Sequence, residues 1–217
     1  WIKLMNIDDI KREFPIFDDK IQNNDLVYLD SANSSQKPRV VVDRIYDFYT
    51  KEFSNVGRSV HYLAVAATNL YEQTRVSVQK YINAKDKDEI VFTKGATEAI
   101  NLVANTFGQK YLSEGDEVLL TELEHHSNYV PWHFLRKAKN IKIEFAEIND
   151  DGEVTLEAIE KKITNKTKII SVSHLSNVTG AILPIKEIVQ LAHSKNIPVL
   201  IDGCQGAPHL KLDMQDI

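Results

Sequence analysis

The chain of 217 residues is long enough for one large domain or a domain and a half, and its 43% hydrophobic and 26% charged residues are typical of a soluble globular protein. Its net charge of −5 and its lack of basic blocks argue against a nucleic-acid partner, and no apolar run reaches the roughly 18 residues that a membrane span needs. A single cysteine excludes an internal disulfide and fits a reducing, cytoplasmic setting.

The chain is expected to begin with a short helix. Met5 is a candidate for the natural start, with Trp1–Leu4 as an upstream extension that lacks the apolar core of a signal peptide. A helix over residues 6–14 would have Asn6 as its N-cap and would end at Pro15.

Two longer helices follow a polar loop. A short strand over Leu26–Leu29 leads into the loop Asp30–Pro38, and Pro38 then opens a helix that runs to Phe53. After a loop over Ser54–His61, a second long helix is expected over Leu63–Ile82.

From residue 89 onward, strands and helices alternate. The expected strands are Glu89–Thr93, Glu117–Thr121, Ile141–Ala146, Lys168–Ser173 and Val199–Ile201. The expected helices are Thr97–Phe107, Asn128–Ala138, Leu156–Ile163 and Ile185–Lys195. This order predicts an α/β domain with a mostly parallel sheet and flanking helices, over residues 21–217 after an amino-terminal segment of residues 1–20.

Asp202 stands at the end of the last expected strand and is followed at once by Gly203. A carboxylate at the carboxyl end of a buried strand points into the crevice where open α/β sheets bind ligands, although Asp-Gly is also a common turn pair. Facing a pyridine nitrogen, it would favour the protonated pyridinium and make the ring an electron sink, as in the tuning of pyridoxal phosphate. Gln205, three residues on, could hydrogen-bond the phenolic oxygen of such a ring.

A second cluster, Thr93–Asn101, runs from a strand into a helix. Gly95 allows a tight turn, and the free N–H groups of the helix start, including that of Ala96, form an anion site to which Thr97 can add its hydroxyl. The motif is neither a P-loop nor GxGxxG, and simple helix capping by Thr97 is the alternative.

Two further clusters also follow strands. Adjacent His125 and His126 cannot share one helical face, so no metal pair is expected; a flat imidazole could instead stack on a planar ligand and carry protons, or the pair could be structural. Asn177 offers a donor and an acceptor to a ligand, with a turn asparagine as the alternative. Four such clusters at the ends of four strands are hard to explain by turns alone.

Taken in order, the motifs resemble those of SufS-type cysteine desulfurases. The stretches that carry the resemblance are Tyr28-Leu-Asp-Ser-Ala, Gln36-Lys-Pro38, Gly95-Ala-Thr-Glu, Glu124-His-His-Ser-Asn, Pro131-Trp132, Ser173-His-Leu-Ser-Asn-Val-x-Gly and Asp202-Gly-x-Gln. These enzymes belong to the fold-type I, class V aminotransferase group that uses pyridoxal 5'-phosphate. The resemblance covers essentially the whole chain from Met5 to Ile217.

The resemblance implies a role for each matching position. Thr97, with the backbone of Gly95 and Ala96, would hold the phosphate. His125 would stack on the ring and carry protons, as the catalytic residue, and Asn177 would lie near the ring oxygen and the substrate. Asp202 would pair with the pyridinium and Gln205 with the phenolate. Ala32, Arg58 and His61 would belong to a substrate loop at the active site.

The implied reaction removes sulfur from L-cysteine, leaving L-alanine and an enzyme persulfide that feeds iron–sulfur cluster assembly through an acceptor protein. The full-length enzyme would be a homodimer. The family's Schiff-base lysine, persulfide cysteine, last sheet strands and small C-terminal domain all fall beyond Ile217. The resemblance therefore implies an incomplete large domain that is inactive alone, with a gap in its sheet between the strands at Glu89–Thr93 and Val199–Ile201. Cys204 is expected to be a packed structural thiol, not the missing nucleophile.

Two other functions stay open. One is a selenocysteine lyase or another class V lyase with the same cofactor. The other is a non-catalytic α/β remnant of such an enzyme, which the departures at Gly57 and Asn33 from the family pattern would favour.

Overall fold

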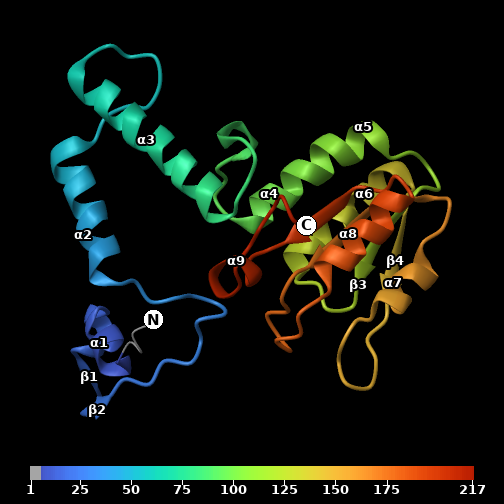
Figure 1. Cartoon of the computed structure of the whole chain (residues 1–217), viewed down its shortest axis with the longest axis horizontal. Coiled ribbons are helices and arrows are strands. Elements are labelled where there is room, and N and C mark those ends of the chain that lie inside the picture. The colour runs from blue at the N-terminus through green and yellow to red at the C-terminus, as the bar shows by residue number, and fades with distance from the viewer. Residues whose placement is uncertain (1–5) are drawn as a thin grey trace. The chain divides into compact units, whose positions relative to one another are not determined.

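The computed structural model describes residues 6–217, whose contacts divide into two units (Figure 1). The first unit ends at Ser77 and the second runs from Val78 to Ile217. The expectations for Met5 and Trp1–Leu4 lie outside the described residues. Within residues 6–217, no helix combines the length and the apolar character needed to cross a membrane.

The first unit is mainly helical, as the sequence predicts. Its α-helices are α1 (Ile7–Arg12), α2 (Arg39–Asp47) and most of α3 (Tyr62–Tyr81), whose last turn belongs to the second unit. It also has a 3-10 turn at Pro15–Phe17 and a π turn at Phe48–Glu52. The Asn6 side chain accepts a hydrogen bond from the Asp8 N–H at 3.1 Å, which confirms the predicted N-cap of α1.

The strand predicted over Leu26–Leu29 is wrong. A two-residue hairpin forms earlier, between β1 (Lys20–Ile21) and β2 (Asn24–Asp25). Its tight turn is made by Gln22 and Asn23, whose φ angles are 53° and 67°, because a two-residue hairpin turn of this kind needs positive φ at both central positions. Residues 26–29 continue without regular structure.

The second unit contains the predicted parallel sheet, with strand order β4-β3-β5-β6. The strands are β3 (Glu117–Thr121), β4 (Lys142–Ala146), β5 (Thr167–Ser173) and β6 (Val199–Asp202). The α-helices are α4 (Ala96–Val103), α5 (Gln109–Tyr111), α6 (Val130–Lys139), α7 (Leu156–Lys162), α8 (Ile185–Ser194) and α9 (Gly206–His209). Shorter turns are the 3-10 helices Lys87–Glu89 and His126–Asn128 and the π turn Ala104–Gly108.

The hydrophobic core lies on both faces of this sheet. Successive residues of a strand point to opposite faces, so Leu119 of β3 packs in one cluster with Ile188 of α8, whereas Leu120 packs in the other with Trp132 of α6. All four side chains are fully buried. The nearly continuous burial along β3 and β5 therefore reflects packing on two faces of the sheet.

One predicted strand of the second unit is wrong. Lys87–Glu89 is a 3-10 helix, and residues 90–93 are not paired into any sheet of the described chain. Val91 and Phe92 remain exposed there, at 68% and 38%. β6 likewise pairs only with β5 among the described residues, so one of its edges is open. An apolar, β-branched run becomes a strand only as part of a sheet, and neither of the two described sheets includes these residues as a strand.

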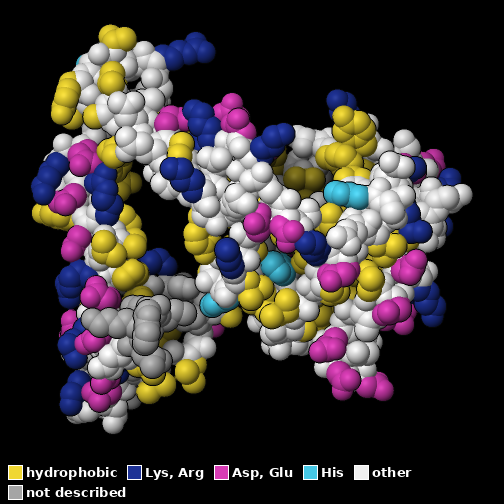
Figure 2. All heavy atoms as spheres, in the orientation of Figure 1, with side chains coloured by type: hydrophobic (Ala, Val, Ile, Leu, Met, Phe, Trp, Pro, Cys, Tyr) yellow, Lys and Arg dark blue, Asp and Glu magenta, His cyan; other side chains and the backbone are white. Residues whose placement is uncertain are grey.

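Charged side chains of both signs are interspersed over the viewed surface instead of gathering by sign (Figure 2). This distribution agrees with the modest net charge of −5. A large, purely basic patch of the kind that attracts polyanions is therefore not seen on this face.

Candidate functional site

Three of the four predicted clusters follow neighbouring strands of the sheet. Asp202 ends β6, the His174–Gly180 stretch follows β5, and the Glu124–Asn128 stretch follows β3. Because these strands are parallel and adjacent, their carboxyl ends meet at one edge of the sheet. The fold thus brings His125 and Asp202 to the same edge.

The Asp202 side chain is buried, at 7% exposure. Its Oδ1 accepts a hydrogen bond from the Cys204 N–H at 3.0 Å, and no lysine, arginine or histidine among the described residues forms an ion pair with it. A buried carboxylate costs desolvation energy unless a cation or several donors compensate for it. Asp202 is therefore suited to a cationic ligand group.

The start of α4 lies across a cavity from Asp202. This cavity, of about 290 Å³, is lined on one side by Ala96, Ile100 and other residues of α4 and on the other by Leu200–Cys204. Gly95 precedes the helix with a φ of 156°, which L side chains rarely adopt, and nothing lies within 4 Å of where its Cβ would be. The first N–H groups of α4 have no intrahelical acceptor, so this end can bind an anion.

The polar groups at this edge fit pyridoxal phosphate. A helix start that can bind the phosphate and a buried carboxylate that can face the ring nitrogen are the two groups that such a ligand needs most. Thr97 itself is exposed on the first turn of α4, where its hydroxyl is free to reach a phosphate.

The His125 imidazole is held by its own turn. The Ser127 N–H donates to His125 Nδ1 at 3.3 Å, and Ser127 Oγ lies 2.7 Å from the same atom. A backbone N–H can only donate, so Nδ1 accepts and the neutral ring carries its proton on Nε2. The ring centroid of His126 lies 3.9 Å from that of His125, and His126 is exposed.

A carboxylate that the sequence did not single out lies beside His125. Glu124 accepts hydrogen bonds from the side chains of Thr121 and Asn128 and from both the backbone and the hydroxyl of Ser173. Burial raises the pKa of this carboxyl above its usual value, and the four hydrogen bonds oppose that shift. The available signals were its position shortly after a buried strand and its place at the start of the Glu124-His-His-Ser-Asn stretch.

The raised pKa predicts how Glu124 affects stability as the pH changes. A carboxyl group with a higher pKa in the folded state stabilises the fold below its unfolded pKa, and this contribution is lost as the pH rises through the folded pKa. We expect the unfolding free energy of the unaltered chain, relative to Glu124→Gln, to fall between about pH 4 and about pH 7. Urea titrations of both proteins at the two pH values measure this difference, and a relative rise would contradict the assignment.

Two other predicted residues lie in exposed or half-buried turns. Asn177 is exposed at the start of the turn after β5, which Ser176 Oγ supports by accepting hydrogen bonds from the N–H groups of Val178 and Thr179, each at 3.2 Å. Gln205 is half-buried directly before α9. The ligand contacts of both residues stay predictions.

The expectation of a packed Cys204 is wrong. The residue is exposed in the turn after β6, because the chain leaves the sheet at Asp202 and the thiol lies at the rim of the cavity. Partial desolvation, and to a lesser extent the Asp202 charge, raise the pKa of the thiol above its usual value. Cys204 therefore stays a neutral thiol and is no activated nucleophile.

Ala32, Arg58 and His61 belong to the first unit. Ala32 lies in a turn, Arg58 is exposed in a bend, and His61 Nδ1 accepts a 3.4 Å hydrogen bond from the N–H of Ala64 in α3. Gly57, beside Arg58, has a φ of 138° that favours glycine. The part that these three residues play at the site stays a prediction.

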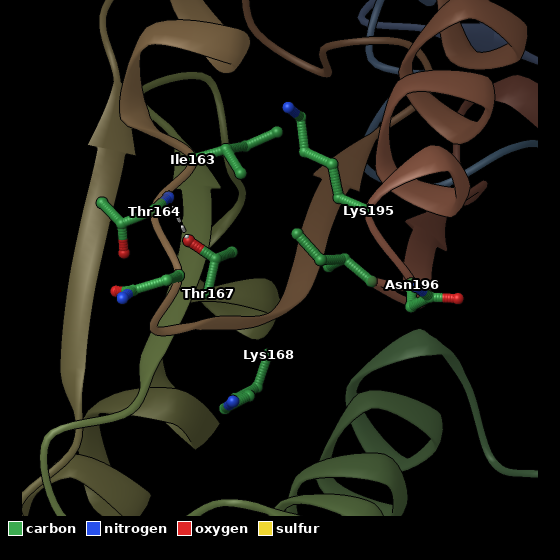
Figure 3. A pocket seen from close by; sticks show the side chains of 8 residues that line it. Ile163, Thr164, Thr167, Lys168, Lys195 and Asn196 are labelled. Atoms are coloured by element: carbon green, nitrogen blue, oxygen red, sulfur yellow. Dashed lines mark hydrogen bonds between the residues drawn. The ribbon is translucent and has the colours of Figure 1, made fainter.

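A larger cavity, of about 560 Å³, lies at the opposite end of β5 (Figure 3). Its lining includes Lys168, Lys195 and Thr164, and the Thr164 N–H donates to Thr167 Oγ1 at 3.0 Å. None of the predicted site residues lines it. The chemistry-bearing side chains gather at the other end of the strands, where α/β sheets bind ligands.

Comparison with known proteins gives a consistent result. The aminotransferase class-V family matches residues 27–217. A probable cysteine desulfurase from Halalkalibacterium halodurans is 45% identical over 98% of this chain and 52% of its own length. The structure of a cysteine desulfurase from Thermococcus onnurineus superposes with a TM-score of 0.90 and is 33% identical; the match covers all of this chain and 52% of that one. The structure of a cysteine desulfurase from Escherichia coli has a TM-score of 0.85 and is 34% identical; the match covers 98% of this chain and 52% of that one. The chain spans about half the length of these relatives.

Proposed function

Because the chain belongs to the class-V aminotransferase family, we propose that it forms the amino-terminal half of a pyridoxal-phosphate-dependent cysteine desulfurase. The observation that carries the proposal is the pairing of the α4 start with the buried Asp202 across one cavity. The names of the relatives support L-cysteine as the substrate.

Each predicted residue would contribute one contact to the bound cofactor. The N–H groups of Gly95 and Ala96 and the hydroxyl of Thr97 would bind the phosphate, and the Asp202 carboxylate would accept a hydrogen bond from the protonated ring nitrogen. Gln205 would donate to the phenolic oxygen. When bound, pyridoxal phosphate supplies an electron sink for bond breaking next to the substrate amine.

The chain's own residues would orient the ring and carry protons. The His125 imidazole would cover one face of the ring and hold a proton at Nε2, and Asn177 would contact the substrate from the turn after β5. Ala32, Arg58 and His61 would shape the substrate loop. Sulfur would leave L-cysteine for an acceptor protein of iron–sulfur cluster assembly, leaving L-alanine, in a cytoplasmic homodimer.

Selenocysteine would present the same amine and carboxylate to these groups, so a lyase acting on it is the closest alternative. The names of the relatives favour cysteine. A non-catalytic remnant is the other alternative, and the buried Asp202 argues against it because a carboxylate without a cation is costly to keep.

The proposal predicts that residues 1–217 alone release no alanine or sulfide from L-cysteine with added pyridoxal phosphate. With a thiol reductant such as dithiothreitol to reduce the enzyme persulfide, a chimera with the carboxyl-terminal half of the Halalkalibacterium halodurans relative should release alanine and sulfide in equal amounts. That half would supply the lysine and the cysteine of the family. The same chimera with Asp202→Ala is the matched control and should be inactive. Alanine from the 217 residues alone would refute the first expectation, and an inactive but folded chimera would refute the proposed function.

A further inference from the structure

The Glu124 carboxylate joins the carboxyl ends of two neighbouring strands. Its Oε1 accepts from Thr121 Oγ1 of β3 at 2.6 Å and from the Ser173 N–H of β5 at 3.0 Å. Its Oε2 accepts from Ser173 Oγ at 2.8 Å. One side chain thus fixes the separation of β3 and β5 where both strands end.

The same carboxylate closes the turn that carries His125. Asn128 Nδ2 donates to Glu124 Oε2 at 2.6 Å, and the Asn128 N–H donates to the His125 carbonyl oxygen at 2.8 Å. Asn128 is fully buried, and its Oδ1 accepts from Ser171 Oγ at 2.5 Å. His125 therefore sits in a turn that begins at Glu124 and whose other end, Asn128, is bound to the Glu124 carboxylate.

The hydrogen bonds from Glu124 continue to Asp202. Ser173 is the direct neighbour of Asp202 in the β5–β6 ladder, and the next residue, His174, donates its N–H to the Asp202 carbonyl oxygen at 3.0 Å. A short route of bonded groups thus runs from His125 through Glu124 and Ser173 to Asp202.

We propose that Glu124 is a positioning residue that sets the placement of the His125 imidazole relative to the Asp202 carboxylate. A planar ligand ring can stack on the His125 imidazole and also bind the Asp202 carboxylate through its nitrogen only if the distance between these two side chains is fixed. This inference rests on the proposed function for the nature of the ligand. The placement itself rests on the hydrogen bonds of the chain.

Glu124→Gln tests the proposal with little change of shape. The Ser173 N–H and the Asn128 amide group face different oxygens of Glu124, and both can only donate through these hydrogens. Whichever oxygen becomes the NH₂ of glutamine, at least one of these donors loses its acceptor. Glu122→Gln is the matched control, because Glu122 is exposed two residues earlier and its side chain accepts a hydrogen bond from the Ile148 N–H at 3.0 Å, with no hydrogen bond to His125 or Ser173 in the described part of the chain.

Two measurements are made on the 217-residue chain with pyridoxal phosphate as the probe. We expect Glu124→Gln to raise the dissociation constant about tenfold, which is the usual effect of losing one hydrogen bond to a charged group. In the unaltered chain, the imidazole ¹⁵N chemical shifts of His125 should be those of a ring protonated at Nε2. We expect Glu124→Gln to move these chemical shifts away from that pattern. Glu122→Gln should change the affinity less than about twofold and leave the signals in place.

The two measurements distinguish a failure of the positioning role of Glu124 from a failure of the proposed function. Absence of binding by the unaltered chain refutes the proposed function, and the His125 signals then decide the positioning role alone. Unchanged His125 signals in a folded Glu124→Gln protein overturn the inference, even if its melting temperature falls. If Glu124→Gln does not fold, Ser173→Ala removes one hydroxyl donor, and the same shift of the His125 signals is expected from it.

Discussion

Replacing Asp202 by asparagine is expected to weaken the binding of pyridoxal phosphate about 100-fold. A factor of 100 corresponds to about 2.7 kcal/mol, slightly below the roughly 3–5 kcal/mol that removing one partner of a buried charge pair costs. The neutral amide keeps the shape of the side chain and can still accept from the Cys204 N–H. What it loses is the charge that would stabilise a protonated ring nitrogen.

The same substitution should leave the fold intact. Because Asp202 is buried and has no ion-pair partner among the described residues, neutralising it should keep or raise the free energy of unfolding. Asp150→Asn, in an exposed loop, is the matched control and should change neither property. Fluorescence titration with pyridoxal phosphate and urea unfolding measure the two effects. Equal affinity in the Asp202→Asn protein would show that this carboxylate does not face the ligand.

Trp132→Ala is expected to have the largest effect on stability, lowering the free energy of unfolding by about 3–5 kcal/mol. The indole is fully buried among the apolar side chains on the α6 face of the sheet, and its Nε1–H donates to Asn128 Oδ1 at 3.4 Å. A Cβ added at Gly108 would lie 3.6 Å from the indole, so the ring packs directly against this backbone. Alanine would leave a cavity that these rigid neighbours can close only in part.

Phe134→Ala is the control for this prediction. Phe134 lies on the same helix but is 63% exposed, so its loss should change the free energy of unfolding by less than about 0.5 kcal/mol. Urea unfolding followed by circular dichroism measures both variants. If Trp132→Ala does not fold, Trp132→Phe should still fold, with a smaller loss. A loss below about 1 kcal/mol for Trp132→Ala would contradict the burial of the indole.

The second unit could largely be predicted from the sequence, because its strands are short stretches rich in apolar and β-branched residues and its helices have regular apolar spacing. Val199–Asp202 and Ile185–Ser194 both formed within a residue of their predicted bounds. The predicted strand Glu89–Thr93 was wrong for a tertiary reason: the apolar pattern of residues 90–93 suits a strand, but these residues are not a strand of either described sheet. The β1–β2 hairpin was missed because its turn uses Gln22 and Asn23 without a glycine.

The positions of the candidate site residues were predictable at the level of residue types and strand ends. The arrival of His125 and Asp202 at one sheet edge followed from the expected parallel strands. The role of Glu124 could not be foreseen, because its partner Ser173 is 49 residues away in sequence and only the packing of β3 against β5 brings the two together. The exposure of Cys204 likewise depends on where the chain leaves the sheet.

An absorbance titration of the unaltered 217-residue chain with pyridoxal phosphate determines whether the start of α4 and Asp202 form a cofactor site. We expect a saturable change in the cofactor spectrum, which the Asp202→Asn protein shows only at far higher concentration. A spectrum identical to that of free pyridoxal phosphate at every protein concentration, for a chain that melts cooperatively, would contradict this expectation.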